Sequence, residues 1–347
     1  MPSLECSNRN GFIDVCKGIG ILLVYYGHSA CWGTLPSRIV FSFHMPLFFL
    51  LSGFVFDVDK IPSLRALLRK VTRNLLLPYI IFVIIGCLMK YDETFLNWKN
   101  DPIGMAIRII HGEGSNSIWF LSCLSMVQIL AWRFLRWAAR FERQFAIGIL
   151  ASMMLVVACG ISLILPESVV SRLPFMSASV PSCLFFFSIG VMCKDELGEF
   201  SFSPFKMSSL LLILPAIFAG LVCINILQRD TFDLRSAKFT VTALPSCVLG
   251  LMLVAYSAKA AMAIPFVYSV LSGIGKRSLC LFALELPCSH IIAKVTSGII
   301  PGRMWLVSHN RAWEPIRIVV ILAMVWLLSY PAMRMLEQAR RYVHVKA

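Results

Sequence analysis

Long apolar runs recur along the chain and constrain its fold more than any other feature of the sequence. A helix that spans a bilayer needs about 20 mostly apolar residues, and the 347 residues contain about ten such runs separated by short loops. We therefore predict an all-α fold, a polytopic transmembrane helix bundle. The ten spans are expected at roughly 12–31, 39–57, 74–90, 117–137, 145–165, 173–193, 207–227, 239–257, 278–293 and 316–334.

The composition agrees with a membrane protein. Hydrophobic residues make up 58% of the chain and charged residues 14%, where a soluble protein has roughly 45–50% and about 25%. This balance excludes a disordered chain and a nucleic-acid binder. The 12 cysteines are scattered through apolar runs without a C-x-x-C pair, so we expect packing residues, no disulfide framework and no metal site. Residues 1–347 are treated as a single integral-membrane domain.

Lys and Arg gather at the ends of the apolar runs, which indicates how the chain crosses the membrane. With the N-terminus inside, 20 of the 32 Lys and Arg fall in inner segments. We therefore expect both termini in the cytoplasm and a bundle surrounded by membrane lipid, in a membrane of the bacterial inner type. On this map, residues 258–277 form an inner loop.

Ionisable residues within the first two spans are candidates for chemistry, because they are costly in a membrane. Lys17 and His28 are eleven positions apart, which places them on one helix face about 16 Å apart along the axis. Asp14 lies one turn before Lys17. His44 follows a short loop around residues 32–38, so its depth should match that of His28. Each histidine alone fits a polar interhelical contact equally well, but the pair suits general acid–base work.

Three basic residues before the third span form a second candidate site: Arg69, Lys70 and Arg73. Basic residues at this place anchor an inner segment on anionic lipid. They also suit the phosphates of a cytoplasmic donor, because a guanidinium fork matches phosphate oxygens. Both roles can hold together.

Four further residues are candidates for contact with a substrate. Trp119, after Asn116, is either an interfacial anchor or a wall for a sugar ring. Ser52, beside Gly53, stands where two helices can approach closely. Glu285 is the only acid deep in a later span, where it either orients a catalytic imidazole or pairs with a neighbouring span.

Together these motifs resemble the acyltransferase type 3 family of integral-membrane acyltransferases, particularly its sugar O-acetylase branch. The first 80 residues carry the specific part of the resemblance, in RNGFIDVCKGIGILLVYYGH at 9–28, FHMPLFF at 43–49 and SGF at 52–54. Sparser matches follow in RNLLLPY at 73–79, WFL at 119–121 and GKRSL at 275–279. One departure is Glu285, in a span where many relatives carry a histidine.

The resemblance implies that Lys17 and His28 form the core of an acyl-transfer site. It also implies acetyl-CoA or another acyl-CoA as donor, and a glycan or lipid-linked sugar hydroxyl as acceptor. On this hypothesis, Asp14 orders Lys17, and His28 either removes the hydroxyl proton or is itself acylated. His44 would orient His28 or stabilise the oxyanion.

We therefore predict a membrane-bound O-acyltransferase, an acetyltransferase in the first place, that acts on a cell-envelope or exported polysaccharide or its lipid-linked precursor. The alternative is a transporter or flippase for a polysaccharide intermediate, in which the buried Lys and His would bind cargo or relay protons. A scaffold for an envelope-biosynthesis complex is a third possibility. The use of acyl-CoA separates the first two, because a transporter has no need of a thioester.

Overall fold

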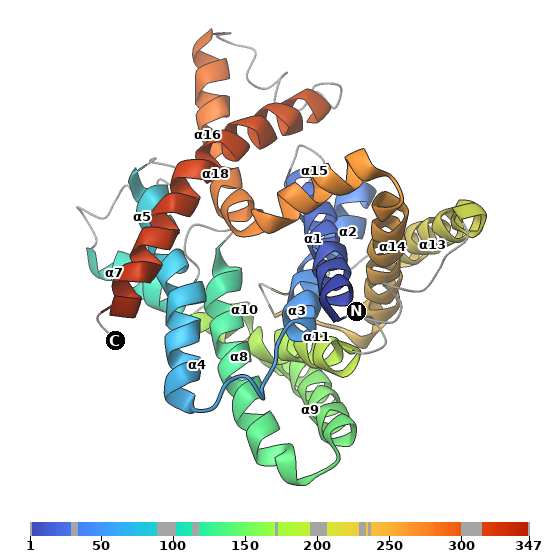
Figure 1. Ribbon diagram of the computed structural model, residues 1–347, viewed down its shortest axis with the longest axis vertical. Helices are drawn as coiled ribbons and strands as arrows, with labels where there is room; N and C mark the ends of the chain where they lie inside the picture. The colour runs from blue at the N-terminus through green and yellow to red at the C-terminus, as the bar shows by residue number, and fades with distance from the viewer. Residues whose placement is uncertain are drawn as a thin grey trace. The chain divides into compact units, whose positions relative to one another are not determined.

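The computed structural model describes residues 2–28, 34–88, 102–112, 118–170, 173–194, 207–228, 234, 237–299 and 314–345. Within these residues the chain is helical and forms no sheet, which confirms the all-α prediction. The longer helices are α1 (Pro2–Gly27), α8 (Trp119–Trp137), α9 (Arg143–Ile164), α13 (Met207–Leu227), α14 (Leu244–Met262), α16 (Ser278–Ile299) and α18 (Glu314–Val345) (Figure 1). The shorter ones are α2 (Leu35–Phe41), α3 (His44–Phe54), α4 (Leu64–Val71), α5 (Leu77–Leu88), α7 (Pro102–His111), α10 (Glu167–Val170), α11 (Val180–Met192) and α15 (Pro265–Lys276).

Several helices are long and apolar enough to cross a bilayer. Among the described residues these candidate spans are Leu35–Phe54, Arg143–Ile164, Pro174–Met192, Val241–Met262 and Ile318–Gln338. The bent pair Pro265–Lys276 and Ser278–Ser289 adds a sixth if it forms one span. The predicted count of ten stays a prediction, but the polytopic character of the bundle does not depend on it.

The chain divides into two compact units. The first comprises Met1–Asp57, Arg133–Pro166 and Pro181–Ser278. In it, α1 lies against α15 and also packs on α2, α3 and α14, while α13 packs on α14 (Figure 1). This unit contains Asp14, Lys17 and both candidate histidines.

The second unit comprises Val58–Trp132, Glu167–Val180 and Leu279–Ala347. A π-helical turn at Thr72–Leu76 joins α4 to α5. Pro78 accounts for this turn, because it has no N–H to donate to the carbonyl four residues earlier. The indole N–H of Trp132 donates to the carbonyl of Ile61 at 3.2 Å and so fastens α8 to the segment before α4.

Two expectations about loops were wrong. Residues 258–277, predicted as an inner loop, include the end of α14 and all of α15. The loop expected at 32–38 is interrupted at Leu35, where α2 begins. Both helices are short and begin with a proline in the first turn, a position at which the missing N–H costs nothing. Neither is long enough to span a bilayer alone, but α2 is part of the candidate span Leu35–Phe54 and α15 is part of the bent pair.

Candidate active site

Helix α1 carries the predicted polar stripe. It ends at Gly27, so His28 occupies the turn directly after the helix. Asp14 and Lys17 are half-buried near the middle of the helix and form the charged end of the stripe. The contact with α15 explains why this end is fixed: a Cβ added to Gly18 would lie 2.2 Å from the carbonyl oxygen of Leu271, and one added to Gly275 would lie 1.7 Å from that of Asp14. The two backbones therefore touch, as small residues permit between membrane helices.

A second lysine joins this charged end. Asp14 interacts electrostatically with Lys17 on its own helix and with Lys276 at the end of α15. The sequence reading placed Lys276 in a loop and gave it no role. The GKRSL run at 275–279 could have indicated this role, because Gly275 allows α15 to approach the backbone of α1 and Lys276 follows it directly. The result is one carboxylate between two ammonium groups, an arrangement with a net positive charge that can hold an anion.

A break between α2 and α3 positions His44. Pro46 cannot donate to the carbonyl of Ser42, so a continuous helix would lack a hydrogen bond at this point. Phe43 leaves the helical conformation, with φ −141° and ψ −15°, and α3 begins at His44. The side chain of Phe43 fills the space above Gly250 of α14, where a Cβ would lie 2.1 Å from the phenyl ring. The break is therefore held by packing as well as by the proline.

Phe41 brings the two candidate histidines to one place. The imidazole of His28 lies 6.0 Å from its ring, centroid to centroid, and the imidazole of His44 lies 4.8 Å from it in an edge-to-face arrangement. Both rings therefore lie beside Phe41, while the expectation that they share one depth stays a prediction. The sequence did not indicate that one aromatic ring contacts both of them.

A backbone hydrogen bond fixes the orientation of His44. This side chain is 4% exposed, and its Nδ1 lies 3.0 Å from the carbonyl oxygen of Val40. A carbonyl can only accept, so Nδ1 carries the proton and Nε2 of the neutral ring is left with a lone pair. His44 can thus accept a hydrogen bond at Nε2. Of the two roles predicted for it, this favours orienting a neighbouring donor over stabilising an oxyanion.

A chain of buried polar groups supports the same break from the other side. Asn225 of α13 donates to the hydroxyl of Ser246 on α14 at 2.7 Å, and this hydroxyl donates to that of Ser42 at 2.9 Å. Ser42 in turn donates to the carbonyl of Ile39 at 2.7 Å. All three side chains are buried, so each bond is protected from competition by water or lipid.

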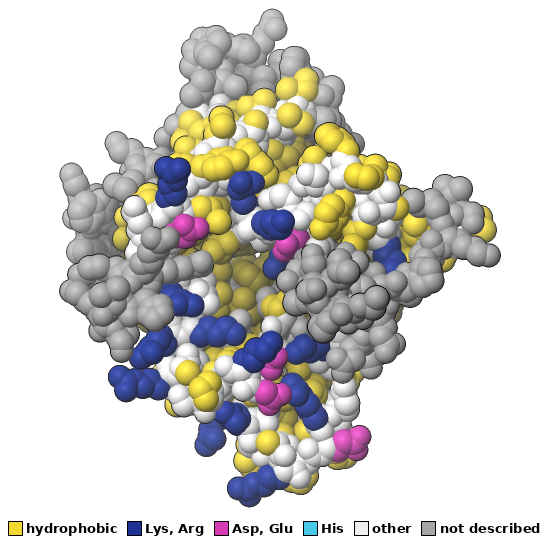
Figure 2. Space-filling view, viewed as in Figure 1, with side chains coloured by type: hydrophobic (Ala, Val, Ile, Leu, Met, Phe, Trp, Pro, Cys, Tyr) yellow, Lys and Arg dark blue, Asp and Glu magenta, His cyan; other side chains and the backbone are white. Residues whose placement is uncertain are grey.

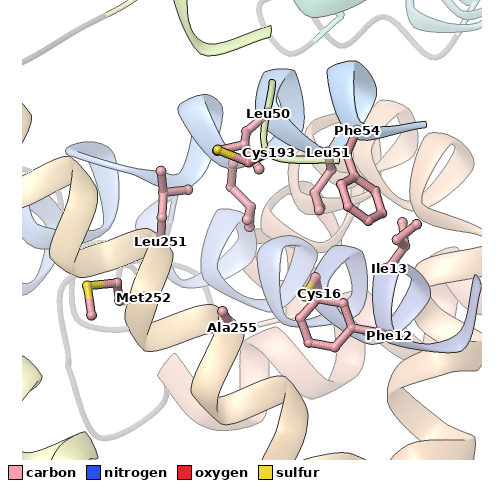
Figure 3. A pocket seen from close by; sticks show the side chains of 11 residues that line it. Phe12, Ile13, Cys16, Leu50, Leu51, Phe54, Cys193, Leu251, Met252 and Ala255 are labelled. Atoms are coloured by element: carbon pink, nitrogen blue, oxygen red, sulfur yellow. The ribbon is translucent and has the colours of Figure 1, made fainter. Parts of the chain in front are cut away.

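An apolar cavity of about 180 Å³ adjoins the charged end of α1 (Figure 3). Its walls come from α1, α3 and α14, with Cys193 at the end of α11. The lining residues are Phe12, Ile13, Cys16, Leu47, Leu50, Leu51, Phe54, Cys193, Leu251, Met252 and Ala255. The two thiols and the thioether of Met252 are the only heteroatoms among these side chains, so the cavity suits hydrocarbon better than a nucleotide or a sugar. Any charged part of a donor must be held elsewhere.

The basic segment lies in the second unit. Arg69 and Lys70 stand in the last turn of α4, where a cation complements the helix dipole, and Arg73 lies in the π-helical turn. The Nε of Arg73 is buried without a hydrogen-bond partner in the described structure. Lys and Arg side chains gather over α4 in the space-filling view (Figure 2). This surface can hold a phosphorylated group or anionic lipid, the two alternatives that the sequence left open.

The remaining substrate candidates have different settings. Trp119 opens α8 and is 5% exposed, and Glu285 of α16 is 3% exposed. The hydroxyl of Ser52 donates to the carbonyl of Phe48 at 2.7 Å, within its own helix. Asn116 falls outside the described residues. Within the part of the chain that the structure describes, no three His, Cys, Asp or Glu side chains lie close enough together to hold a metal ion.

Comparison with known proteins adds a family. The sequence model of a family described as an acyltransferase domain matches residues 10–333. Searches of curated proteins and of solved structures give no significant match. The matched range includes Asp14, Lys17 and His28, the break before α3 and the basic segment of α4.

Proposed function

Since this chain belongs to the acyltransferase type 3 family, we propose that it is an O-acyltransferase that moves an acyl group, acetyl in the first place, from acyl-CoA to a sugar hydroxyl. The acceptor is a cell-envelope or exported polysaccharide or its lipid-linked precursor. The chain itself is an integral-membrane acyltransferase. The observation that carries the proposal is the packing of His28 and His44 on the one ring of Phe41.

The proposed reaction is a transfer from a thioester to an alcohol. His28 takes the proton of the acceptor hydroxyl as its oxygen attacks the thioester carbonyl. The new C–O bond forms, the C–S bond breaks, and the proton passes to the departing thiolate. Free coenzyme A and a sugar ester are the products. His44, with its Nδ1 proton engaged by Val40, accepts at Nε2 and keeps the imidazole of His28 in the productive orientation.

Two groups of cations are proposed to bind the donor. Lys17, ordered by Asp14 and accompanied by Lys276, presents positive charge at one end of the polar stripe on α1. Arg69, Lys70 and Arg73 supply a second basic surface, and the unpaired Nε of Arg73 supports an anion there. We propose that both face the cytoplasm, in a membrane of the bacterial inner type with both termini inside. Trp119, Asn116, Ser52 and Glu285 remain the candidates for contact with the acceptor.

Mass spectrometry of envelope glycans tests the proposal. We compare cells that carry the wild-type protein, the His28→Ala protein, a His111→Ala control or no protein. A labile ester with the mass of one acetyl group is expected with the wild type and with the control, and in neither of the other two. A protein inserted at normal levels that forms the ester without His28 would contradict this assignment. Unchanged esters with altered export would instead favour the transporter.

A purified assay separates donor use from acceptor identity. The wild-type protein in detergent should release free thiol from acetyl-CoA when a hydroxylated acceptor is supplied, and the His28→Ala protein should not. No thioester consumption with any acyl-CoA, from a protein that restores glycan acylation in cells, would overturn the choice of donor and leave acyl transfer intact.

A further inference from the structure

One face of α2 connects the imidazoles to a buried cation. Arg38, Phe41 and Ser42 are three and four positions apart, so their side chains are neighbours on the helix surface. Phe41 contacts both histidines, and Ser42 closes the polar chain from α13 and α14. Arg38 is the charged member of this face. It lies about one helical turn from the ring on which the candidate catalytic groups pack.

The guanidinium of Arg38 is poorly satisfied. Its Nη1 donates to the carbonyl of Gln228 at 3.4 Å, a long hydrogen bond, and its Nε is buried without any partner in the described structure. Among the described residues, the guanidinium of Arg73 in the basic segment also has a buried Nε without a hydrogen-bond partner. A guanidinium has five N–H donors and is always charged. Half-buried in an apolar bundle, it is stable only when an anion or several acceptors approach it.

The polar neighbours of Arg38 among the described residues do not supply that anion. Ser42 and Ser246 engage each other, and the side-chain amide of Gln228 donates to the carbonyl of Thr242. The ion pair found elsewhere in this unit joins Lys194 to Asp57 at 3.7 Å. A cation in the last turn of α2 complements the helix dipole. This role does not require the Nε of Arg38 to be buried.

We propose that Arg38 binds an anionic group of the acceptor, a carboxylate or a phosphate, and so presents a nearby hydroxyl to His28. A guanidinium fork matches the paired oxygens of either group. Because Arg38 lies about one turn from Phe41, and the ring of Phe41 contacts both imidazoles, one acidic or phosphorylated sugar can reach the cation and the imidazoles. Arg38 is then a specificity residue that selects charged acceptors. This inference rests on the proposed function and names the substrate class for it.

A binding experiment tests the inference without any acyl transfer. The full chain is placed in nanodiscs of zwitterionic lipid, and its melting temperature is measured with methyl glucuronate, glucose 1-phosphate or methyl glucoside. At least one anionic sugar should raise the melting temperature of the wild type and of the exposed-site control Arg140→Gln, and leave that of Arg38→Gln unchanged. The neutral glycoside should do nothing. A response to glucuronate alone assigns a carboxylate, and a response to the phosphate alone assigns a sugar phosphate.

Two results would overturn the inference. One is the absence of any response in the wild type, as expected if Asp230 or Asp233, which follow Gln228 in the sequence and lie outside the described residues, already neutralise Arg38. The other is an equal response in Arg38→Gln. Since neither depends on thioester chemistry, failure here is distinct from failure of the proposed acyl transfer.

Kinetics of transfer give a second readout. Arg38→Gln should raise the acceptor KM about tenfold or more, as expected when a charge-assisted hydrogen bond is lost, and leave the donor KM unchanged. Arg38→Lys should recover part of the loss, because it restores the charge without the fork. An equal rise in both KM values, or no rise with a charged acceptor, would show that Arg38 is structural.

Discussion

The two ends of the polar stripe on α1, Asp14 with Lys17 at one and His28 at the other, are held in different ways. At the charged end, α15 reaches Asp14 through backbone contact, and a Cβ at Gly275 would lie 1.7 Å from its carbonyl oxygen. At the other end, the imidazole of His28 contacts a side chain, the ring of Phe41, at 6.0 Å between centroids. A backbone contact leaves no room for adjustment, whereas a ring can shift. Substitutions at the charged end should therefore destabilise the fold strongly. Substitutions at the imidazole end should leave the fold intact and lower kcat by amounts that depend on the side chain.

The largest effect is expected at Gly275. In Gly275→Ala the new methyl group meets a backbone atom that cannot move without displacing α1, so the loss of unfolding free energy should reach about 3 kcal/mol or more, the upper range for overpacking. Thermal unfolding of the purified protein in detergent measures it. The matched control is Gly148→Ala on α9, where nothing lies within 4 Å of the added Cβ. Equal melting temperatures for the two variants would show that the backbone contact at Asp14 does not make this part of α1 intolerant of substitution.

His44 tests the other end. In His44→Asn the amide can still donate to the carbonyl of Val40, as Asn225 does to the carbonyl four residues before it at 2.9 Å. The fold should therefore persist, while the acceptor at Nε2 is lost and kcat falls about 100-fold, a size typical of a lost polar group at an active site. In His44→Gln a carbonyl oxygen stands near the Nε2 position and should recover part of the rate. A reversed order of the two variants, measured by thiol release, would contradict the orienting role.

The sequence predicted the long helices well, because twenty consecutive apolar residues have few other stable conformations in a membrane. The span predicted at 207–227 coincides with α13, and that at 145–165 nearly coincides with α9. It failed at α15 and at the break after Phe41. Both depend on tertiary contacts, the first on glycines facing another backbone and the second on Phe43 seated above Gly250.

The candidate site was predicted to a similar degree. Asp14, Lys17 and His28 could be grouped because a helix repeats every 3.6 residues. Lys276 and Arg38 could not, since their importance comes from which side chains other helices bring near them. The pairing of the histidines was inferred from equal distance to a turn. The sequence could not indicate that the ring of Phe41 contacts both histidines, because nothing distinguishes this residue among the 25 phenylalanines of the chain.

A smaller effect is expected from Phe41→Leu. The substitution keeps an apolar side chain on α2 but removes the ring contacts to both imidazoles, which contribute about 1 kcal/mol in such pairs. The imidazoles should then sample more orientations, and kcat should fall roughly tenfold because small misplacements of reacting groups are costly. Folding should change little. If kcat stayed at the wild-type value in a correctly folded variant, the ring of Phe41 would have a packing role only. The imidazole end would then not depend on this ring for activity, contrary to our proposal.

The smallest effect separates two adjacent residues of α3. The hydroxyl of Ser52 donates to the carbonyl of Phe48, and such a local bond adds little to helix stability. Ser52→Ala should therefore change the unfolding free energy by less than about 0.5 kcal/mol. Gly53 is its matched contrast, because an added Cβ would lie 2.0 Å from the carbonyl oxygen of Phe187, the same kind of contact that fixes the charged end of α1. Gly53→Ala should thus resemble Gly275→Ala in thermal unfolding. Acceptor KM decides the role of the serine: a rise of more than about twofold in Ser52→Ala at unchanged stability would return its hydroxyl to the substrate site.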